Sequence, residues 1–132
     1  MKHITHDKGD LGVIKVQAKL IEMGHQIFVP ISSASPYDLI VLIGNEFKKV
    51  QVKYVTSKNN CITISTRRAI RNGNAKYCTN TDIDILAIYC PCTNECYFLY
   101  KDTYIEAVSL RLTIPKNNQI KNIRMANDFT KL

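Results

Sequence analysis

Asp38, Gln51 and Lys53 are the residues whose types and spacing are best suited to chemistry. Gln51 and Lys53 are two positions apart, so on a strand their side chains leave the same face. Asp38 begins an apolar run, and a hairpin with the strand that carries Lys53 would bring the Asp38 carboxylate close to that face. A carboxylate, an amide oxygen and an ammonium group converging on one sheet are suited to the hydrolysis of a phosphodiester bond.

Each of these groups has a distinct expected role. The Asp38 carboxylate is a ligand for a hard cation, and the Val52 carbonyl oxygen is a second one. Such a cation polarises the phosphate and lowers the pKa of a bound water, while Lys53 orients that water or stabilises the developing negative charge. A plainer alternative is that Asp38 caps a loop and Lys53 is a surface lysine, because each short motif is common by chance.

The hydrophobic pattern predicts the elements that must position these residues. Residues 10–23 carry apolar side chains at helical spacing, and Gly24 is a suitable end for that helix. Residues 37–43 form a nearly continuous apolar run, as in a central strand buried on both faces. The Gly-Asn pair that follows predicts a tight turn into a partner strand over 46–55.

Shorter patterns predict the remaining elements. They are strands over 26–31, 61–65, 83–89, 96–100 and 110–114, a long loop over 67–81, and short helices over 102–107 and 123–129. The sum is an α/β or α+β chain of 132 residues, a length that suits one domain spanning residues 1–132.

The charges are unevenly distributed along the chain. Lys and Arg number 18 against 11 Asp and Glu, a formal net charge of +7. Residues 47–81 and 107–127 contain no carboxylate. Such segregation favours the approach of a polyanion, because no nearby carboxylate repels its phosphates. The alternative is a solvated basic face without a partner.

Beyond these residues, a longer pattern resembles a known family. The sequence Pro36-Tyr37-Asp38, followed by Gln51 and Lys53, resembles the P-D…(D/E)-x-K signature of the restriction-like nuclease superfamily. Five further segments strengthen the likeness to its small members, which include cyanobacterial group I intron homing endonucleases. These segments are residues 8–12, 27–32, 84–91, 110–119 and 123–126. The resemblance extends from about residue 8 to residue 129.

The resemblance implies a restriction-endonuclease-like α/β fold with a mixed four-stranded sheet flanked by helices. It implies hydrolysis of double-stranded DNA with Mg²⁺, for which Mn²⁺ can substitute. It also implies a homodimer or homotetramer, because cutting both strands takes two active sites. Gln51 stands where most of the superfamily has an acid, and this branch tolerates glutamine there.

One position departs from the family pattern. The resemblance predicts a metal-binding glutamate on the first helix, and Val13 occupies that position. Asp10 lies about one turn earlier and is the nearest alternative carboxylate. With Gln51 neutral and Val13 apolar, Asp38 can be the one charged ligand, and a single carboxylate binds magnesium weakly.

Two further segments are candidate DNA contacts. Arginine and lysine can contact phosphates and guanine, and asparagine and glutamine can pair with adenine. The candidates are Arg67, Arg68, Arg71, Lys76, Lys116, Asn117, Asn118 and Gln119. For both segments the alternative is a solvated loop, and for residues 116–119 it is also an oligomer contact.

The cysteines and the apolar runs bear on other classes of protein. Cys90, Cys92 and Cys96 have a C-x-C-x₃-C spacing without a second cysteine pair, so we expect small hydrophobic residues and not a zinc site. No apolar run approaches the roughly 20 residues of a membrane span. The first residues lack the apolar centre of a signal peptide. We therefore expect a cytoplasmic protein without a membrane partner.

Three functions remain open from the sequence. The first is a site-specific DNA endonuclease of the homing or restriction type. The second is a Holliday-junction resolvase, although the long segment over 67–81 suits sequence readout better than recognition of a junction. The third is a catalytically weakened or inactive DNA-binding protein of the same fold, for which Val13 and Gln51 are the evidence.

Overall fold

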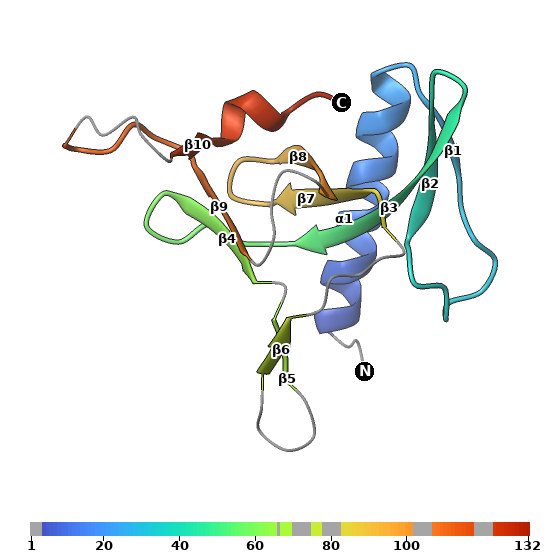
Figure 1. Ribbon diagram of the computed structural model, residues 1–132, viewed down its shortest axis with the longest axis horizontal. Coiled ribbons are helices and arrows are strands. Elements are labelled where there is room, and N and C mark those ends of the chain that lie inside the picture. Colours follow the sequence, from blue (N-terminus) through green and yellow to red (C-terminus); the bar gives the residue numbers. More distant parts are fainter. Residues whose placement is uncertain (1–3, 66, 70–74, 78–82, 102–106, 118–122) are drawn as a thin grey trace.

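The computed structural model describes residues 4–65, 67–69, 75–77, 83–101, 107–117 and 123–132 (Figure 1). Its first element, α1, spans Ile4–Glu22 and packs one side against a sheet. The helix starts six residues before the predicted residue 10, and ends before Gly24, whose φ of 87° is accessible to glycine at little cost. Gly12, Val16 and Leu20 form its buried stripe.

A five-stranded mixed sheet forms the centre of the fold. Its strands, in spatial order, are β1 (Gln26–Phe28), β2 (Leu39–Ile43), β3 (Glu46–Tyr54), β7 (Ile85–Cys90) and β8 (Glu95–Tyr100). The pair β3–β7 is parallel and the other three pairs are antiparallel. The mixed sheet and the β2–β3 hairpin expected from the sequence are thereby confirmed, with five strands in place of four.

A second, smaller sheet covers the face of the central sheet that lies opposite α1. It contains β10 (Arg124–Met125), β9 (Ala107–Arg111) and β4 (Cys61–Ser65), and a 3₁₀ helix, η2 (Ala126–Phe129), follows it. The resemblance implies helices flanking the sheet: α1 covers one face, and the small sheet together with η2 covers the other. The predicted helix over 123–129 is wrong for its first residues, which pair with β9 as a strand.

Two hydrophobic cores result, one on each face of the central sheet. Every residue of β7 is buried, and successive side chains enter opposite cores. Ile85, Ala87 and Tyr89 face the α1 core, whereas Leu86, Ile88 and Cys90 face the core under the small sheet.

Two predictions along the second half of the chain are corrected. The strand predicted over 110–114 lies instead at Ala107–Arg111, where Val108 and Leu110 enter the core and the intervening positions are polar or small. The predicted loop over 67–81 contains a hairpin formed by β5 (Arg67–Ala69) and β6 (Ala75–Tyr77). Strands this short show no period that a sequence pattern could reveal. Residues 102–106 of the helix predicted over 102–107 lie outside the described residues.

In the described part of the chain, no helix has the length and apolar character needed to cross a bilayer.

Candidate active site at the open edge of β3

The side chain of Asp38 is bonded to the backbone of β3. The amide of Val52 donates a 2.7 Å hydrogen bond to Asp38 Oδ2, and the Asp38 amide donates to the Val50 carbonyl at 2.9 Å. The last residue pair between β2 and β3 is Leu39 with Val50, so no residue of β2 lies opposite Val52. The Asp38 carboxylate therefore accepts the hydrogen bond that a longer β2 would have accepted through its backbone.

The carbonyl of Val52 faces the same edge. In an antiparallel ladder the N–H and C=O of one residue point to the same neighbouring strand. The Val52 N–H points to Asp38. The Val52 carbonyl oxygen therefore points to the same side, which β2 does not reach because it begins at Leu39. Strand β2 begins only at Leu39, and Pro36, shortly before it, has no amide N–H to donate to a ladder. The predicted pairing of the Asp38 carboxylate with the Val52 carbonyl is thus compatible with the backbone.

Gln51 and Lys53 lie on either side of Val52 along β3. Val50, Val52 and Tyr54 contact the core under α1, so the alternating residues Gln51 and Lys53 face away from the helix. Gln51 is half-buried and Lys53 is exposed. The structure therefore places both side chains on one face, as the sequence predicts, beside an edge that carries a carboxylate.

Helix α1 passes close to this part of β3. A methyl group added at Gly12 would lie 3.5 Å from Val52 Cγ1 and 3.5 Å from Tyr54 Cβ, which are ordinary van der Waals distances, so Gly12 lies directly beside this part of the strand. Val13 is the next residue and is half-buried. Asp10 is exposed and lies further round the helix, away from the sheet.

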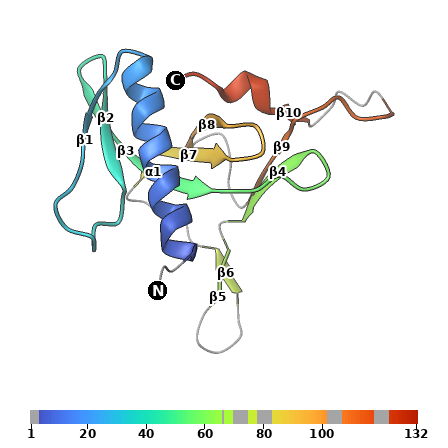
Figure 2. The ribbon, with the colours of Figure 1, turned by 180° about the vertical axis from the view of Figure 1, so that it is seen from behind.

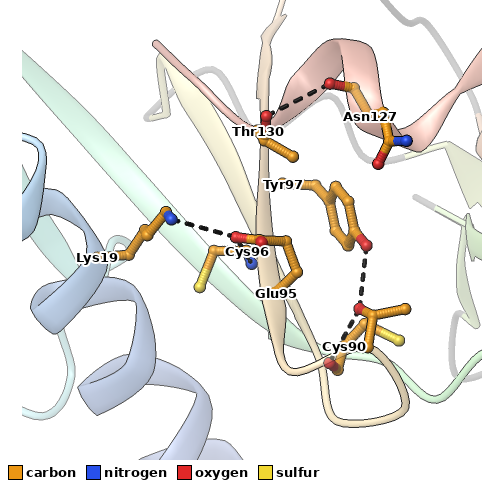
Figure 3. A network of polar contacts seen from close by, with 8 residues as sticks. Lys19, Cys90, Glu95, Cys96, Tyr97, Asn127 and Thr130 are labelled. Carbon is orange, nitrogen blue, oxygen red and sulfur yellow. Dashed lines mark hydrogen bonds and ion pairs between the residues drawn. The ribbon is translucent and has the colours of Figure 1, made fainter.

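The orientation of Val13 follows from the opposite flank of the helix. Lys19 forms a 3.3 Å ion pair with Glu95 on β8 (Figure 3), and Lys15 donates to Asn94 Oδ1 at 3.2 Å. Both lysines therefore mark the flank that faces β7 and β8. Successive helical residues are about 100° apart, which puts Val13 on the other flank, toward β2. Asp38 precedes β2 and lies on that side of β3.

The oxygen donors at this edge suit a hard cation in kind but are poor in charge. Asp38 supplies a carboxylate, Val52 a carbonyl and Gln51 an amide oxygen, which are the donor types that Mg²⁺ takes. Among the described residues, no group of three or more His, Cys, Asp and Glu converges on one point. Waters and a DNA phosphate would have to complete the coordination.

A second aspartate, Asp84, is hydrogen-bonded to β3, and the sequence patterns did not single it out. Asp84 Oδ2 accepts a 2.9 Å hydrogen bond from the Lys49 amide, and the Asp84 amide donates to the Lys49 carbonyl at 2.8 Å. Asp84 immediately precedes β7, just as Asp38 immediately precedes β2. That shared position before an apolar strand was the available signal.

The candidate DNA contacts occupy two separate projections. Arg67, Arg68 and Lys76 belong to the β5–β6 hairpin, which extends away from the sheets, and Arg71 lies outside the described residues (Figure 1). Lys116 and Asn117 are exposed on a turn that projects in a different direction, and positions 118–119 are not described.

The cysteines do not converge. Cys90 is buried under the small sheet and Cys96 is buried under α1, so the two thiols lie on opposite faces of the central sheet (Figure 3). Burial raises the pKa of Cys96 to about 11, which disfavours the thiolate that zinc requires. Cys92 is exposed, and a hydrogen bond with Ser57 lowers its pKa. A single ion cannot bind Cys90 and Cys96 together.

The mixed sheet, with Asp38, Gln51 and Lys53 along one strand edge, is the arrangement that the sequence resemblance to restriction-like nucleases predicts. The model of the PD-(D/E)XK endonuclease family matches residues 3–132. The chain therefore belongs to the PD-(D/E)XK endonuclease family, whose substrate is DNA and whose members generally use divalent metal ions.

A solved structure has the same fold. It is the bacterial homing endonuclease I-Ssp6803I, with a TM-score of 0.73 and 20% sequence identity over 96% of this chain and 88% of that chain. At this identity the likeness shows the fold, which confirms the restriction-endonuclease-like class predicted from the sequence. A comparison with curated proteins finds no match.

Proposed function

We propose that this protein is a site-specific DNA endonuclease that hydrolyses phosphodiester bonds with a divalent metal ion, Mg²⁺ first and Mn²⁺ as a substitute. The observation that carries the proposal is the 2.7 Å hydrogen bond that the Val52 amide donates to the Asp38 carboxylate. It lies just outside the paired part of β2 and β3. It fixes a carboxylate beside the strand that bears Gln51 and Lys53. We propose that it acts as one domain, in the cytoplasm, and as a homodimer or homotetramer.

Each residue of the edge has a proposed task. Asp38 and the Val52 carbonyl hold the cation, with Gln51 as a neutral third donor. Bound there, a divalent cation supplies a Lewis acid for the phosphate and lowers the pKa of a bound water. Lys53 is exposed on the same face as Gln51, where its ammonium can stabilise the negative charge that develops on the phosphate.

A second candidate function has its own observation. Val13 lies on the flank of α1 that faces β2, where a glutamate would add a second carboxylate next to Asp38. Its apolar side chain leaves the edge with one charged ligand, so the chain would bind DNA and cleave it slowly or not at all. Asp10 is exposed and turned away from the sheet, which makes it a poor replacement.

DNA binding is proposed for two projections of the molecule. The β5–β6 hairpin carries Arg67, Arg68 and Lys76, and its arginines are suited to groove reading and phosphate contacts. Lys116 and Asn117 are exposed on the second projection. Because the two extend in different directions, we propose that they contact different parts of a duplex.

A metal titration on plasmid DNA tests these proposals. The full chain is incubated with a library of supercoiled plasmids that carry random inserts, at increasing Mg²⁺, with EDTA and Ca²⁺ as controls. We expect linear DNA with ends that share one sequence, formed in Mg²⁺ and absent in EDTA. Ends without a shared sequence would refute site specificity, and cleavage in EDTA would refute the metal. Binding without cleavage at every Mg²⁺ concentration would support the second candidate.

A further inference from the structure

Helix α1 has a second apolar stripe on the side opposite its buried one. Leu11, Ile14, Ala18 and Ile21 are all exposed, with Ile14 at 60% and Ile21 at 59%. Their spacing of three, four and three residues is the a/d spacing of a coiled coil. Figure 2 shows α1 in front of the central sheet, with no other described element over it. A helix that is apolar on opposite faces is expected to be covered on both.

A carboxylate lies at the N-terminal end of this stripe. Asp7 is within the regular part of the helix and continues the stripe toward the N-terminus. The helix ends at Glu22, and the positive φ of Gly24 turns the chain away from the helical path, so the stripe ends at Ile21. Asp7 forms no ion pair in the part of the chain that the structure describes.

The stripe matches its own reverse. When two copies of α1 are laid antiparallel, with the two-fold axis beside Val16, Leu11 of one copy meets Ile21 of the other and Ile14 meets Ala18. Both layers are of the a-to-d kind found in antiparallel coiled coils. A two-fold interface must be self-complementary in this way, because residue i contacts residue j and j contacts i.

The flanking charges favour the antiparallel direction. In the same register Lys8 of one copy lies near Glu22 of the other, which gives two attractive contacts about the axis. A parallel pair would instead bring Asp7 against Asp7. Lys15, which would meet its own copy at the centre, is drawn aside by its hydrogen bond to Asn94 and by the Tyr89 ring, whose centroid is 5.7 Å from its Nζ.

We propose that the exposed stripe of α1 is a homodimer interface, at which a second copy of this chain packs its own α1 in the antiparallel direction. The interface specifies the surface by which the proposed oligomer forms, and it rests on that part of the proposed function. A helix of 19 residues is about 28 Å long. A helix pair of this length lies at the low end of stable interfaces.

The first test measures mass in the absence of DNA and metal. Sedimentation equilibrium of the full chain should give at least twice the 15.0 kDa of one copy. Ile14→Glu should reduce that mass about twofold, because the charge cannot be buried against Ala18 of the partner. Ile114→Glu is the matched control, since Ile114 is 71% exposed and follows β9, which packs on the face of the central sheet opposite α1, and its mass should equal that of the parent. A monomeric parent, or an unchanged mass for Ile14→Glu, overturns the proposal.

The second test reads the direction of the pair. Lys8→Glu places two carboxylates near each other at each end of the pair, and Glu22→Lys places two lysines there, so each single change should weaken the dimer about tenfold. The double variant exchanges the two groups and should restore the dissociation constant to within about threefold of the parent. Failure of restoration would exclude the antiparallel register. Loss of dimer together with binding of α1 to anionic lipid vesicles would instead identify a membrane surface as the occupant.

The two proposals can fail separately. Mass is measured without substrate, so a dimer that never cleaves DNA would refute the nuclease and leave the interface intact. A monomer that cleaves DNA would refute the interface and leave the nuclease intact.

Discussion

Two aspartates bind opposite edges of the same strand with almost the same hydrogen bond. Asp38 accepts the amide of Val52 at 2.7 Å, and Asp84 accepts the amide of Lys49 at 2.9 Å. Each carboxylate is partly buried, and each residue immediately precedes a strand of the central sheet. Their local chemistry is nearly identical, so it does not explain why only one of them lies at an open edge of β3.

What separates them is the backbone that continues beyond each one. Beyond Asp84, the parallel pair of β3 with β7 runs on for five residue pairs, and the Asp84 carbonyl also accepts the Lys101 amide at 3.0 Å. Beyond Asp38, β3 continues through Val52 to Tyr54 without β2 beside it. Asp84 lies where β3 and β7 continue side by side, so its carboxylate joins two strands. Asp38 lies where β3 has no β2 residue beside it, which leaves the Val52 carbonyl and the second Asp38 carboxylate oxygen for a ligand.

The largest expected effect tests whether the face beside the open edge is catalytic. Lys53→Ala should reduce Mg²⁺-dependent cleavage by about 1,000-fold or more, because the ammonium stabilises charge that forms only in the transition state. DNA affinity should stay within a few-fold. Cleavage is measured by single-turnover kinetics, with Lys49→Ala as the control on the same face of β3. Undiminished cleavage by Lys53→Ala would remove this residue from the chemistry.

The next effect separates the charge of Asp38 from its hydrogen bond. Asp38→Asn keeps an oxygen for the Val52 amide but removes the negative charge, so cleavage should fall about 100-fold or more while thermal stability changes little. The measurement pairs cleavage rates with a melting curve. A large loss of stability with normal activity would show that Asp38 acts as Asp84 does.

Asp84→Ala should show the reverse pattern. Removal of the carboxylate leaves the partly buried Lys49 amide without its acceptor, which should lower the free energy of unfolding by about 1–3 kcal/mol. The folded fraction should cleave DNA at the rate of the parent, since no metal ligand is lost. Denaturant unfolding together with active-site titration measures both quantities. A selective loss of cleavage would place Asp84 in the catalytic site.

A smaller effect is expected from adding a carboxylate at the open edge. Val13→Glu should raise the cleavage rate about tenfold or lower the Mg²⁺ requirement by a similar factor, because the site then has two charged ligands. Asp10→Asn is the companion variant and should have little effect, since Asp10 is exposed and turned from the sheet. A loss of activity in Asp10→Asn, with no gain in Val13→Glu, would identify Asp10 as the second ligand.

The smallest effect concerns DNA binding by the β5–β6 hairpin, which is separate from both edges of β3. Arg68→Ala, on the β5–β6 hairpin, should weaken binding and reduce the slope of log affinity against log salt by about one unit if it contacts a phosphate. If it reads a base, preference at one position should be relaxed at a cost of about 1–3 kcal/mol. Fluorescence anisotropy on specific and random duplexes separates the two outcomes. Unchanged binding to both would remove this residue from the DNA contact.

The sequence by itself determined the elements whose signals are local. The apolar run before Lys48 and the Gly-Asn turn predicted the β2–β3 hairpin, and the two-residue spacing of Gln51 and Lys53 placed them on one face, as observed. The β5–β6 hairpin and the position of β9 could not be predicted in this way. Short strands become strands because of their partners, and those pairings join positions distant in the chain, such as Thr63 and Ser109.

The tertiary structure alone decided which of two similar aspartates faces an open edge. Both precede apolar strands, so the local sequence marks them equally. Whether a strand lies beside β3 at each aspartate depends on where β2 and β7 begin along it. The same holds for α1, whose apolar positions indicate a helix without indicating which stripe the sheet buries. In the folded chain Gly12, Val16 and Leu20 face the sheet, with Gly12 beside Val52 and Tyr54, and Leu11, Ile14 and Ile21 are exposed.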